Sequence, residues 1–349
     1  MDIILVNQDF ERLGIIDNAS VIWNDRYYEN GEFEIYFPII DSSLELLTQS
    51  FYVVRDDDEN NVGVIQDVEL SHNSNNGDFI TLTGKFATGY YFSKRVIPSQ
   101  TTLYDTIPNI IRTLVDQNII NPSNSKRKIN SIKLGNSVDG LTTKTNMQTT
   151  GGNLLEKISE VCKTYKIGFK MPIVNNELRF DLYEGSDRSY GQSENPYVVF
   201  SDEYDNLDEV VYNRNASNKI NFAYVAGEGE GINRKIVSAY EGEEPSGYDR
   251  NEIWVDQRNM SSNEGEITDE ELTEQMKEEG IENLVPITEN LDGKLLNTTG
   301  YVYGKDFFLG DIVTVQMKKW NGMYINARIV EVIESEDENG KTLTFTFEK

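Results

Sequence analysis

Residues 64–71 read Val-Ile-Gln-Asp-Val-Glu-Leu-Ser, and residues 328–335 read Arg-Ile-Val-Glu-Val-Ile-Glu-Ser. Three positions recur at a spacing of 264 residues: Ile65, Val68 and Ser71 against Ile329, Val332 and Ser335. Apolar residues that alternate with polar ones are typical of half-buried strands. Each stretch also lies between two shorter β-type runs, at 52–54 and 79–83 or at 313–315 and 342–347. The sequence therefore predicts two antiparallel meanders with one layout.

Two interpretations of this repeat stay open. Antiparallel meanders resemble one another without any duplication, because strands, turns and alternation recur in all of them. The other interpretation is a duplicated small β-barrel whose two copies are separated by other units. Both interpretations predict a β-rich chain.

The first hundred residues continue the strand pattern. Strands at 21–23 and 32–37 flank Asn30-Gly31, a favoured hairpin turn. Ser42 and Glu45 form a capping-box pattern, which predicts a short helix there. Later strands are expected at 198–200, 209–212, 220–226, 299–303, 311–317, 324–335 and 342–348.

The middle of the chain predicts a small α+β unit. Apolar residues at helical spacing run from Leu103 to Leu114, and Pro108 suits the first turn of that helix. A second helix is expected at 153–165, with Asn153 as its N-cap and Glu156 completing a capping box. Gly168 is expected to end it. A hairpin around Asn175-Asn176 follows.

The charge of the chain is concentrated in one segment. With 32 basic and 59 acidic residues the formal net charge is −27, and residues 241–292 hold 17 acidic and 3 basic residues, or −14. Thr268 and Glu271 form a capping box for a helix inside this segment. A solvated face explains such a segment most simply, and an insertion that docks a partner is the sharper interpretation.

Composition excludes several classes of function. A strongly acidic chain lacks the basic footprint that gripping nucleic acid requires. One histidine, His72, and one cysteine, Cys162, exclude an intrachain disulfide and leave no second imidazole for a zinc site. No apolar run is long enough to span a membrane, and the N-terminus has no signal-peptide pattern.

Few residue constellations point to chemistry. The glycines of 227–231 follow a strand but lack the Gly-Lys-Ser/Thr ending of a phosphate loop, so a turn is expected. Asp56, Asp58, Asn60 and Asp67 match four ligand positions of a calcium loop, yet a hairpin turn is favoured because position 6 is not glycine. His72 is expected to be exposed, and Cys162 to lie on the apolar face of its helix. Abundant carboxylates leave a glycosidase pair open.

An ordered series of phrases resembles a known family. The phrases occupy residues 31–34, 84–97, 152–156, 178–180, 199–201, 224–234, 250–256 and 303–315. They include Tyr-Val-Ala-Gly-Glu-Gly-Glu-Gly at 224–231 and Tyr-Gly-Lys-Asp-Phe-Phe-Leu-Gly-Asp-Ile-Val-Thr-Val at 303–315. Together they resemble the siphophage ReqiPepy6 Gp37-like tail proteins, a family similar to baseplate hub and tail-tip proteins, over nearly the whole chain.

This resemblance implies a structural subunit of a phage tail tip. It implies a homotrimer whose paired tube-like β-barrels form a pseudo-sixfold ring on the tail tube, open for DNA passage. The implied partners are the distal tail, tail tube and tape-measure proteins, and the implied location is the virion after assembly in the host cytoplasm. An acidic lumen would repel the DNA backbone. The resemblance leaves open whether the tail is contractile and which host the phage infects.

The expected fold is therefore β-rich α+β and multidomain. Barrel I covers residues 1–97, an α+β domain 98–195, barrel III residues 196–236 and 294–349, and an acidic inserted domain 237–293. Larger tail-tip proteins of this type carry fibre or lytic extensions, whereas this chain ends at Lys349 after the last predicted strand, so we expect no receptor-binding or lytic activity. We also expect no enzyme, cofactor or metal site. Interface residues are expected at Gly227, Gly229, Gly231, Arg234, Arg250, Asp256 and Asp311.

Two alternatives from other classes remain. An extracellular carbohydrate-binding module fits a β-rich chain with 19 tyrosines, and it requires aromatic side chains grouped on one exposed face. A cell-wall glycoside hydrolase requires a pocketed pair of carboxylates.

Overall fold

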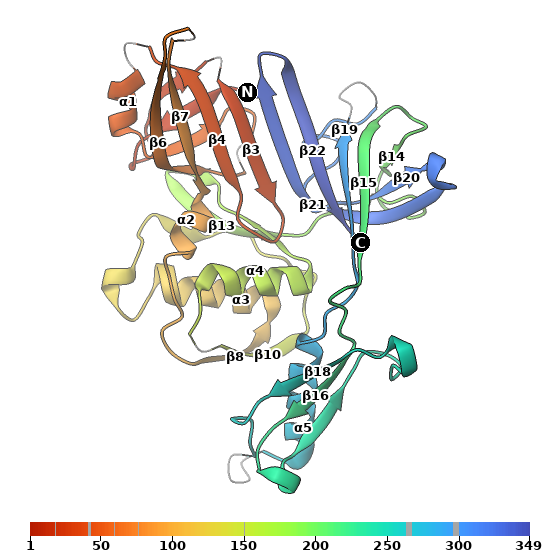
Figure 1. The fold of residues 1–349 in the computed structure, drawn as a ribbon. Helices are drawn as coiled ribbons and strands as arrows, with labels where there is room; N and C mark the ends of the chain where they lie inside the picture. The colour runs from red at the N-terminus through yellow and green to blue at the C-terminus, as the bar shows by residue number, and fades with distance from the viewer. Residues whose placement is uncertain are drawn as a thin grey trace. The chain divides into compact units, whose positions relative to one another are not determined.

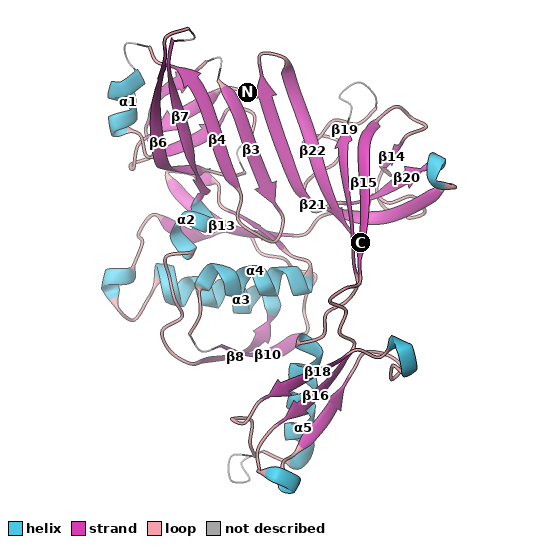
Figure 2. Ribbon diagram, viewed as in Figure 1, coloured by secondary structure: helices cyan, strands magenta, loops and turns pink. Residues whose placement is uncertain are grey.

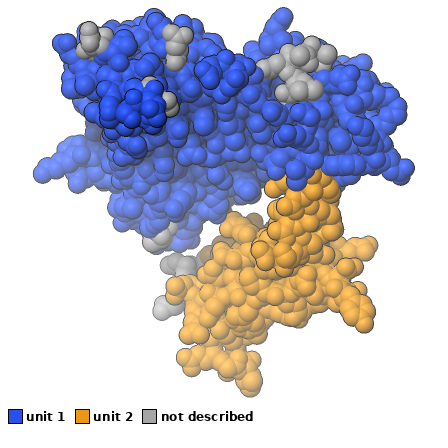
Figure 3. Space-filling view, turned by 45° about the horizontal axis from the view of Figure 1, so that its top comes forward, with its two compact units in different colours: residues 1–211, 291–349 blue, residues 212–290 orange. Residues whose placement is uncertain are grey.

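The chain folds into two compact units in the computed structural model (Figures 1 and 3). Unit 1 comprises Met1–Val211 and Leu291–Lys349, and unit 2 comprises Tyr212–Asn290. The structure describes residues 1–17, 19–40, 43–58, 60–75, 77–149, 151–262, 267–295 and 300–349. The finer division into four domains stays a prediction.

Unit 1 contains a 13-stranded sheet that holds both predicted meanders. We call residues 3–86 the first repeat; its strands are β1 (Ile3–Val6), β2 (Arg12–Ile16), β3 (Ser20–Arg26), β4 (Glu32–Pro38), β5 (Tyr52–Arg55), β6 (Gly63–Asn73) and β7 (Gly77–Phe86). We call residues 199–215 and 288–348 the second repeat; its strands are β14 (Val199–Ser201), β15 (Leu207–Asn215), β19 (Thr288–Leu295), β20 (Ile312–Met317), β21 (Met323–Asp337) and β22 (Gly340–Glu348).

The two repeats share strand order and an irregularity. The first runs β3-β4-β7-β6-β5-β1 and the second β15-β19-β22-β21-β20-β14. The register of β6 against β7 shifts between Ile65 and Asp67, and that of β21 against β22 shifts between Ile329 and Glu331. Gln66 and Val330, the extra residues, lie 264 positions apart. A bulge conserved in position is a specific feature, so the shared layout reflects more than the general likeness of meanders.

The sheet does not close on itself within the described residues, so two separate closed barrels are not confirmed. The physical reason is the length of β21. Its first part, Met323–Arg328, pairs with β20, and its later part, Glu331–Glu336, pairs with β3 of the first repeat. One 15-residue strand thus joins both repeats into one open sheet.

Alternation places the core of the first repeat on one face of this sheet. β4 alternates exposed Glu32, Glu34 and Tyr36 with buried Phe33, Ile35 and Phe37. The buried set packs around Trp23, with the short helix α1 (Ser43–Gln49) beside it. α1 confirms the predicted helix; Ser42 of its capping pattern lies outside the described residues.

The α+β part of unit 1 packs three helices against small sheets (Figure 2). Its helices are α2 (Ala87–Phe92), α3 (Ile107–Val115) and α4 (Leu154–Tyr165), and its strands are β8 (Thr101–Thr106), β9 (Ile132–Leu134), β10 (Lys144–Thr149), β11 (Gly168–Lys170), β12 (Ile173–Val174) and β13 (Glu177–Tyr183). Asn153 caps α4 as predicted, its Oδ1 accepting the Leu155 N–H at 2.9 Å. The helix ends at left-handed Lys166, earlier than the expected Gly168.

Unit 2 is a three-stranded sheet with one helix, inserted between β15 and β19. Its elements are β16 (Phe222–Ala226), β17 (Ile236–Ala239), β18 (Glu252–Asp256) and α5 (Asp269–Glu282). The predicted capping box at Thr268 and Glu271 is confirmed. In the first repeat, the counterparts of β15 and β19 are β3 and β4, which are joined by five residues. Unit 2 is therefore inserted where the first repeat has a short hairpin connection.

The strand predicted at 299–303 is wrong over residues 300–303, the part that the structure describes. Residues 300–303 form a bend and an isolated bridge of Tyr303 with Phe307, and residue 299 lies outside the described residues. Within the described ranges, no helix is both long and apolar enough to cross a membrane.

Candidate functional site

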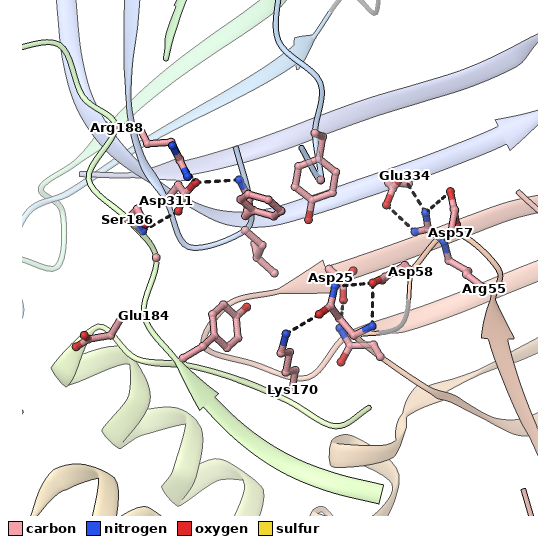
Figure 4. Close-up of a pocket in the computed structure, with 18 of the residues that line it drawn as sticks. Asp25, Arg55, Asp57, Asp58, Lys170, Glu184, Ser186, Arg188, Asp311 and Glu334 are labelled. Carbon is pink, nitrogen blue, oxygen red and sulfur yellow. Dashed lines mark hydrogen bonds and ion pairs between the residues drawn. The ribbon is translucent and has the colours of Figure 1, made fainter. Parts of the chain in front are cut away.

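A polar pocket of about 490 Å³ opens in unit 1 where the two repeats meet the α+β part (Figure 4). The turn after β5, the end of β13 and the later half of β21 contribute to its wall. Its charged lining residues are Asp25, Arg55, Asp57, Asp58, Lys170, Glu184, Arg188, Asp311, Glu334 and Lys341.

A buried ion pair joins the repeats beside this pocket. Arg55 ends β5 of the first repeat, and Glu334 lies on β21 of the second; their side chains are 2% and 4% exposed. Arg55 Nη1 donates to Glu334 Oε1 at 2.6 Å, and Nη2 donates to Oε2 at 3.2 Å. The other edge of the same guanidinium donates to both oxygens of Asp57, at 2.9 and 3.0 Å.

Lys341 completes this cluster, with Nζ 2.5 Å from Glu334 Oε2 and 3.7 Å from Asp57 Oδ2. Two cations therefore face two carboxylates. Because a planar guanidinium binds carboxylates in fixed bidentate geometry, the cluster holds β5 and β21 at one spacing. Its chemistry is that of a clamp between the repeats.

Asp25 on β3 is the exception to this charge pairing. Its side chain is buried, and its Oδ1 accepts one hydrogen bond from Asn61 Nδ2 at 2.6 Å. Burial, and then repulsion by Asp58, raise the pKa of the Asp25 carboxyl well above its usual value of 3.8. The proton on Asp25 is therefore held more tightly in the folded chain than in the unfolded chain.

This gives unit 1 a stability that falls as pH rises. Above the unfolded pKa of Asp25, near 4, the folded chain keeps the proton and the unfolded chain releases it. The free energy of unfolding then falls by up to about 1.4 kcal/mol per pH unit until the folded pKa is passed. Asp25→Asn keeps the acceptor for Asn61 and removes the titrating group. We expect a higher unfolding free energy at neutral pH.

Urea unfolding of wild type and Asp25→Asn between pH 4 and 8 measures this difference. The gap between the two chains should widen with pH. Glu184→Gln is the matched control, because this carboxylate lines the same pocket but is exposed. A gap that stays constant over the range would contradict the assignment.

Asp311 is the one predicted interface residue that lies in this pocket. It is 2% exposed, and its carboxylate accepts from Ser186 N–H and Arg188 Nε, both at 2.7 Å, and from Phe308 N–H at 3.0 Å. These contacts hold the segment after β13 along β20. Asp311 therefore positions a connection between parts of unit 1.

The other predicted interface residues lie in unit 2. Arg234 donates to the carbonyls of Gly227 and Ala226 at 3.0 and 2.9 Å and pairs with Asp256. Gly229 and Gly231 have positive φ angles of 96° and 57° and turn the chain between them. Arg250 lies at the other end of β18, paired with Glu252 and Glu244 at 2.5 and 2.8 Å. Their role at an interface stays a prediction.

The remaining sequence candidates have ordinary structural roles. His72 is exposed near the end of β6, where its ring contacts Asp78. Cys162 is buried on α4, and burial raises the pKa of its thiol. β5 and β6 pair antiparallel across the Asp56–Asn61 turn, as the hairpin interpretation predicted. Among the described side chains, no group of three His, Cys, Asp or Glu is arranged to hold a metal ion.

Sequence reasoning missed Arg55, Glu334 and Asp25. One signal was present in the repeat itself. Glu334 occupies the place of Leu70, 264 residues earlier, so a charge replaces an apolar residue in the later copy. Arg55 likewise ends an apolar run, Tyr52-Val53-Val54, and aligns with Val315, since Val64 pairs with Tyr52 and Arg328 with Ile312. A charged residue thus replaces an apolar one once in each repeat, and two such replacements of opposite charge indicate an ion pair between the repeats.

Comparison with solved structures shows the fold of known tail proteins. The tail protein from Neisseria meningitidis MC58 matches with a TM-score of 0.58 and 12% identity over 100% of this chain and 96% of that one. The 43 kDa tail protein of prophage MuSo2 from Shewanella oneidensis matches with a TM-score of 0.56 and 11% identity, covering 99% and 98%. The prophage tail protein gp18 from Listeria monocytogenes EGD-e matches with 0.53 and 11%, covering 99% and 94%.

No curated protein sequence matches the chain. The family model of the Siphovirus ReqiPepy6 Gp37-like proteins matches residues 2–347. That match spans both repeats, the α+β part and unit 2, which is nearly the whole molecule. The chain therefore belongs to the Siphovirus ReqiPepy6 Gp37-like protein family.

Proposed function

We propose that this chain is a non-enzymatic hub subunit of a phage tail tip, in which three copies close into a ring around a passage for DNA. The carrying observation is an open strand edge in the first repeat whose counterpart in the second repeat is paired. Family membership and the tail-protein fold of its structural relatives support the tail location. The distal tail, tail tube and tape-measure proteins are the proposed neighbours in the virion, after assembly in the host cytoplasm.

The paired edge belongs to β21. Glu331–Glu336 pair with Arg26–Val21 of β3, and this pairing covers the later half of β21. Val332 and Glu334 are consequently 1% and 3% exposed.

The open edge belongs to β6. After the bulge at Gln66, the pairings of the described residues give β6 one neighbour, β7. Val68 and Leu70, the counterparts of Val332 and Glu334, are 50% and 56% exposed. A long edge strand that carries apolar side chains favours pairing with another chain. β6 therefore offers the contact that β21 has already made.

The complementary strand is β15, the counterpart of β3. It stands at one end of the sheet order, with β19 as its neighbour. Val210-Val211-Tyr212-Asn213 in β15 matches Val21-Ile22-Trp23-Asn24 in β3, and the counterparts Ile22 and Val211 are both exposed. If β15 of one copy pairs with β6 of the next as β3 pairs with β21, then Leu70 faces Tyr212 and Val68 faces Arg214 of that copy.

This pairing makes each chain add two repeats to a continuous sheet. Three chains supply six repeats, which matches the hexameric symmetry implied by the family resemblance. In a ring the sheet has an inner and an outer face. The face covered by the core around Trp23 and by α1 needs more room, so we place it outside and the free face inside.

The free face of the first repeat carries acidic side chains and threonines. The pairing registers align Glu34, Thr83 and Asp67 in one row and Tyr36, Thr81 and Glu69 in the next. Glu32, Glu34, Asp67 and Glu69 are all exposed. Carboxylates repel the DNA backbone at short range, so such a wall lets DNA slide without binding.

Cysteine cross-linking tests the ring. Leu70→Cys with Tyr212→Cys places the two thiols on facing positions of neighbouring copies, within the reach of a disulfide. Native Cys162 is fully buried and does not compete. On oxidation we expect dimers and then trimers, with most of the product ending at three chains.

Val96→Cys with Tyr212→Cys is the matched control, because Val96 is 57% exposed but lies away from β6. This control should give no cross-linked product on oxidation. A ladder that continues past three chains, or no cross-link in both concentrated protein and tail particles, would contradict the ring.

A further inference from the structure

Unit 2 carries an aromatic surface that assembly of the ring does not require. Its sheet has two faces. Val225, Val237 and Val255 point toward α5 and pack around Leu272 and Met276. The residues that alternate with these valines point to the other face, where register partners form three rows that cross the strands.

The middle row is the open one. It consists of Ser238, Tyr224 and Trp254, which are register partners on β17, β16 and β18. Trp254 is 53% exposed and Ser238 is exposed, whereas Tyr224 is half-buried. The two aromatic side chains come from neighbouring strands and, with Ser238, make a row about 10 Å wide across the three strands. The Tyr224 ring packs edge-on against Phe222, with the centroids 4.8 Å apart.

An arginine stands over each flanking row. Arg250 lies over the ring of Phe222, 3.5 Å from its centroid, and Nη2 donates to the Tyr224 hydroxyl at 3.2 Å. On the other side, Arg234 lies near Trp254, 5.9 Å from its centroid, and is held by Asp256 and two backbone carbonyls. The two rows are four residues apart, or about 13 Å. We call this surface, Ser238, Tyr224 and Trp254 with Arg234 and Arg250, the aromatic trough.

The charges around the aromatic trough balance. Arg234, Arg250 and Arg258 pair with Glu244, Glu252 and Asp256, so three positive and three negative groups cancel. Unit 2 as a whole is strongly acidic: residues 212–290 hold 18 acidic and 7 basic residues, or −11. An anionic ligand is repelled by that field, whereas a neutral ligand meets donors and acceptors already held in place.

We propose that the aromatic trough binds a neutral saccharide. The C–H face of a sugar ring packs on an aromatic floor, and its hydroxyls accept hydrogen bonds from the fixed guanidinium groups and donate hydrogen bonds to the carboxylates on either side. Because both arginines are anchored by ion pairs before the ligand arrives, little side-chain entropy is lost on binding. This activity belongs to β16–β18 of unit 2 and uses none of the β6 and β15 residues that are proposed to join neighbouring copies in the ring.

Glycan binding by the full chain tests the proposal. The probe is an array of neutral oligosaccharides, with sulfated and phosphorylated glycans on the same array. We expect wild type to bind at least one neutral glycan and Trp254→Ala to bind it at least tenfold more weakly. Trp254→Phe keeps an aromatic floor and should lose less.

Trp320→Ala is the matched control, because Trp320 is a 39% exposed tryptophan in unit 1 and should leave binding unchanged. Cross-linked trimers of the Trp254→Ala chain show separately whether the ring is intact. No binding to any neutral glycan, equal binding by Trp254→Ala, or binding to anionic glycans alone would overturn the proposal.

Discussion

Replacing Arg55 with valine is expected to lower the free energy of unfolding of unit 1 by about 3–5 kcal/mol. The change removes the partner of Glu334, a carboxylate that is 4% exposed and held by two guanidinium hydrogen bonds. Removing one member of a buried ion pair is costly because the other charge stays buried. Lys341 still contacts Glu334, which places the expected loss toward the lower end of that range.

Replacing Glu334 by leucine in the same chain should restore most of the lost free energy of unfolding. Arg55 aligns with Val315 in the second repeat, and Glu334 aligns with Leu70 in the first. The double variant Arg55→Val with Glu334→Leu therefore gives each position the residue of its counterpart. Asp57 and Lys341 remain and face each other at 3.7 Å. A buried pair replaced by apolar residues of similar volume is often as stable as the original.

Urea unfolding followed by tryptophan fluorescence measures both variants. Trp23 is fully buried, and the guanidinium of Arg55 lies 5.7 Å from its ring centroid, so its emission reports this region. Arg26→Val is the matched control: Arg26 ends β3 and pairs with Glu331 of the same strand β21, but its side chain is 28% exposed. We expect the control to lose about 1 kcal/mol or less. A double variant as unstable as Arg55→Val would contradict the clamp.

Local signals in the sequence predicted individual elements well. The N-cap at Asn153, the capping box at Thr268 and the hairpin turn at Asn175-Asn176 are confirmed. β3 and β4 pair as the predicted hairpin, but Asn30-Gly31 only ends their five-residue connection, and neither residue has a positive φ. Each depends on residues a few positions apart, whose preferences act before any tertiary contact forms. Asn175 and Asn176 both adopt positive φ, which asparagine tolerates better than most residues.

Pairings between distant strands were not predictable in the same way. Nothing in Glu331–Glu336 indicates that this part of β21 pairs with β3, some 300 residues earlier. A strand pattern states which face is buried and leaves the neighbour undetermined. The open sheet, the buried Arg55–Glu334 pair and the pocket beside them all depend on that one pairing.

The aromatic trough shows the same limit at a smaller scale. Trp254 and Tyr224 are 30 residues apart and belong to strands that run parallel. Their alternation with Val255 and Val225 predicts exposure, but the register that makes them neighbours follows from the fold of unit 2. Arg234 and Arg250 were predicted as interface residues from the family phrases, without the ion pairs that anchor them.

The other large effect is expected at the open edge of β6, where Val68→Lys should prevent ring closure. In the proposed register Val68 faces Arg214 of the next copy, so the variant places two positive charges opposite each other. Like charges on facing residues cost up to about 1 kcal/mol per pair, and a lysine at an edge position also disfavours strand addition. Three such contacts in one ring amount to about 3 kcal/mol, or roughly a hundredfold in the association constant.

A charge swap separates this specific contact from a general disturbance of the edge. Val68→Lys with Arg214→Glu places opposite charges on the facing positions and should restore trimers, measured by light scattering and by electron microscopy of rings. Arg214 pairs with Glu289 at 3.5 Å in its own copy, and Arg214→Glu replaces this pair by two neighbouring carboxylates, so the single variant Arg214→Glu measures that cost in the same assay. Val96→Lys, at a similarly exposed valine away from the edge, should assemble like wild type. If the double variant fails to assemble while each chain remains folded, β6 does not pair with β15 in this register; if Val68→Lys alone assembles normally, the edge of β6 is not the contact between copies.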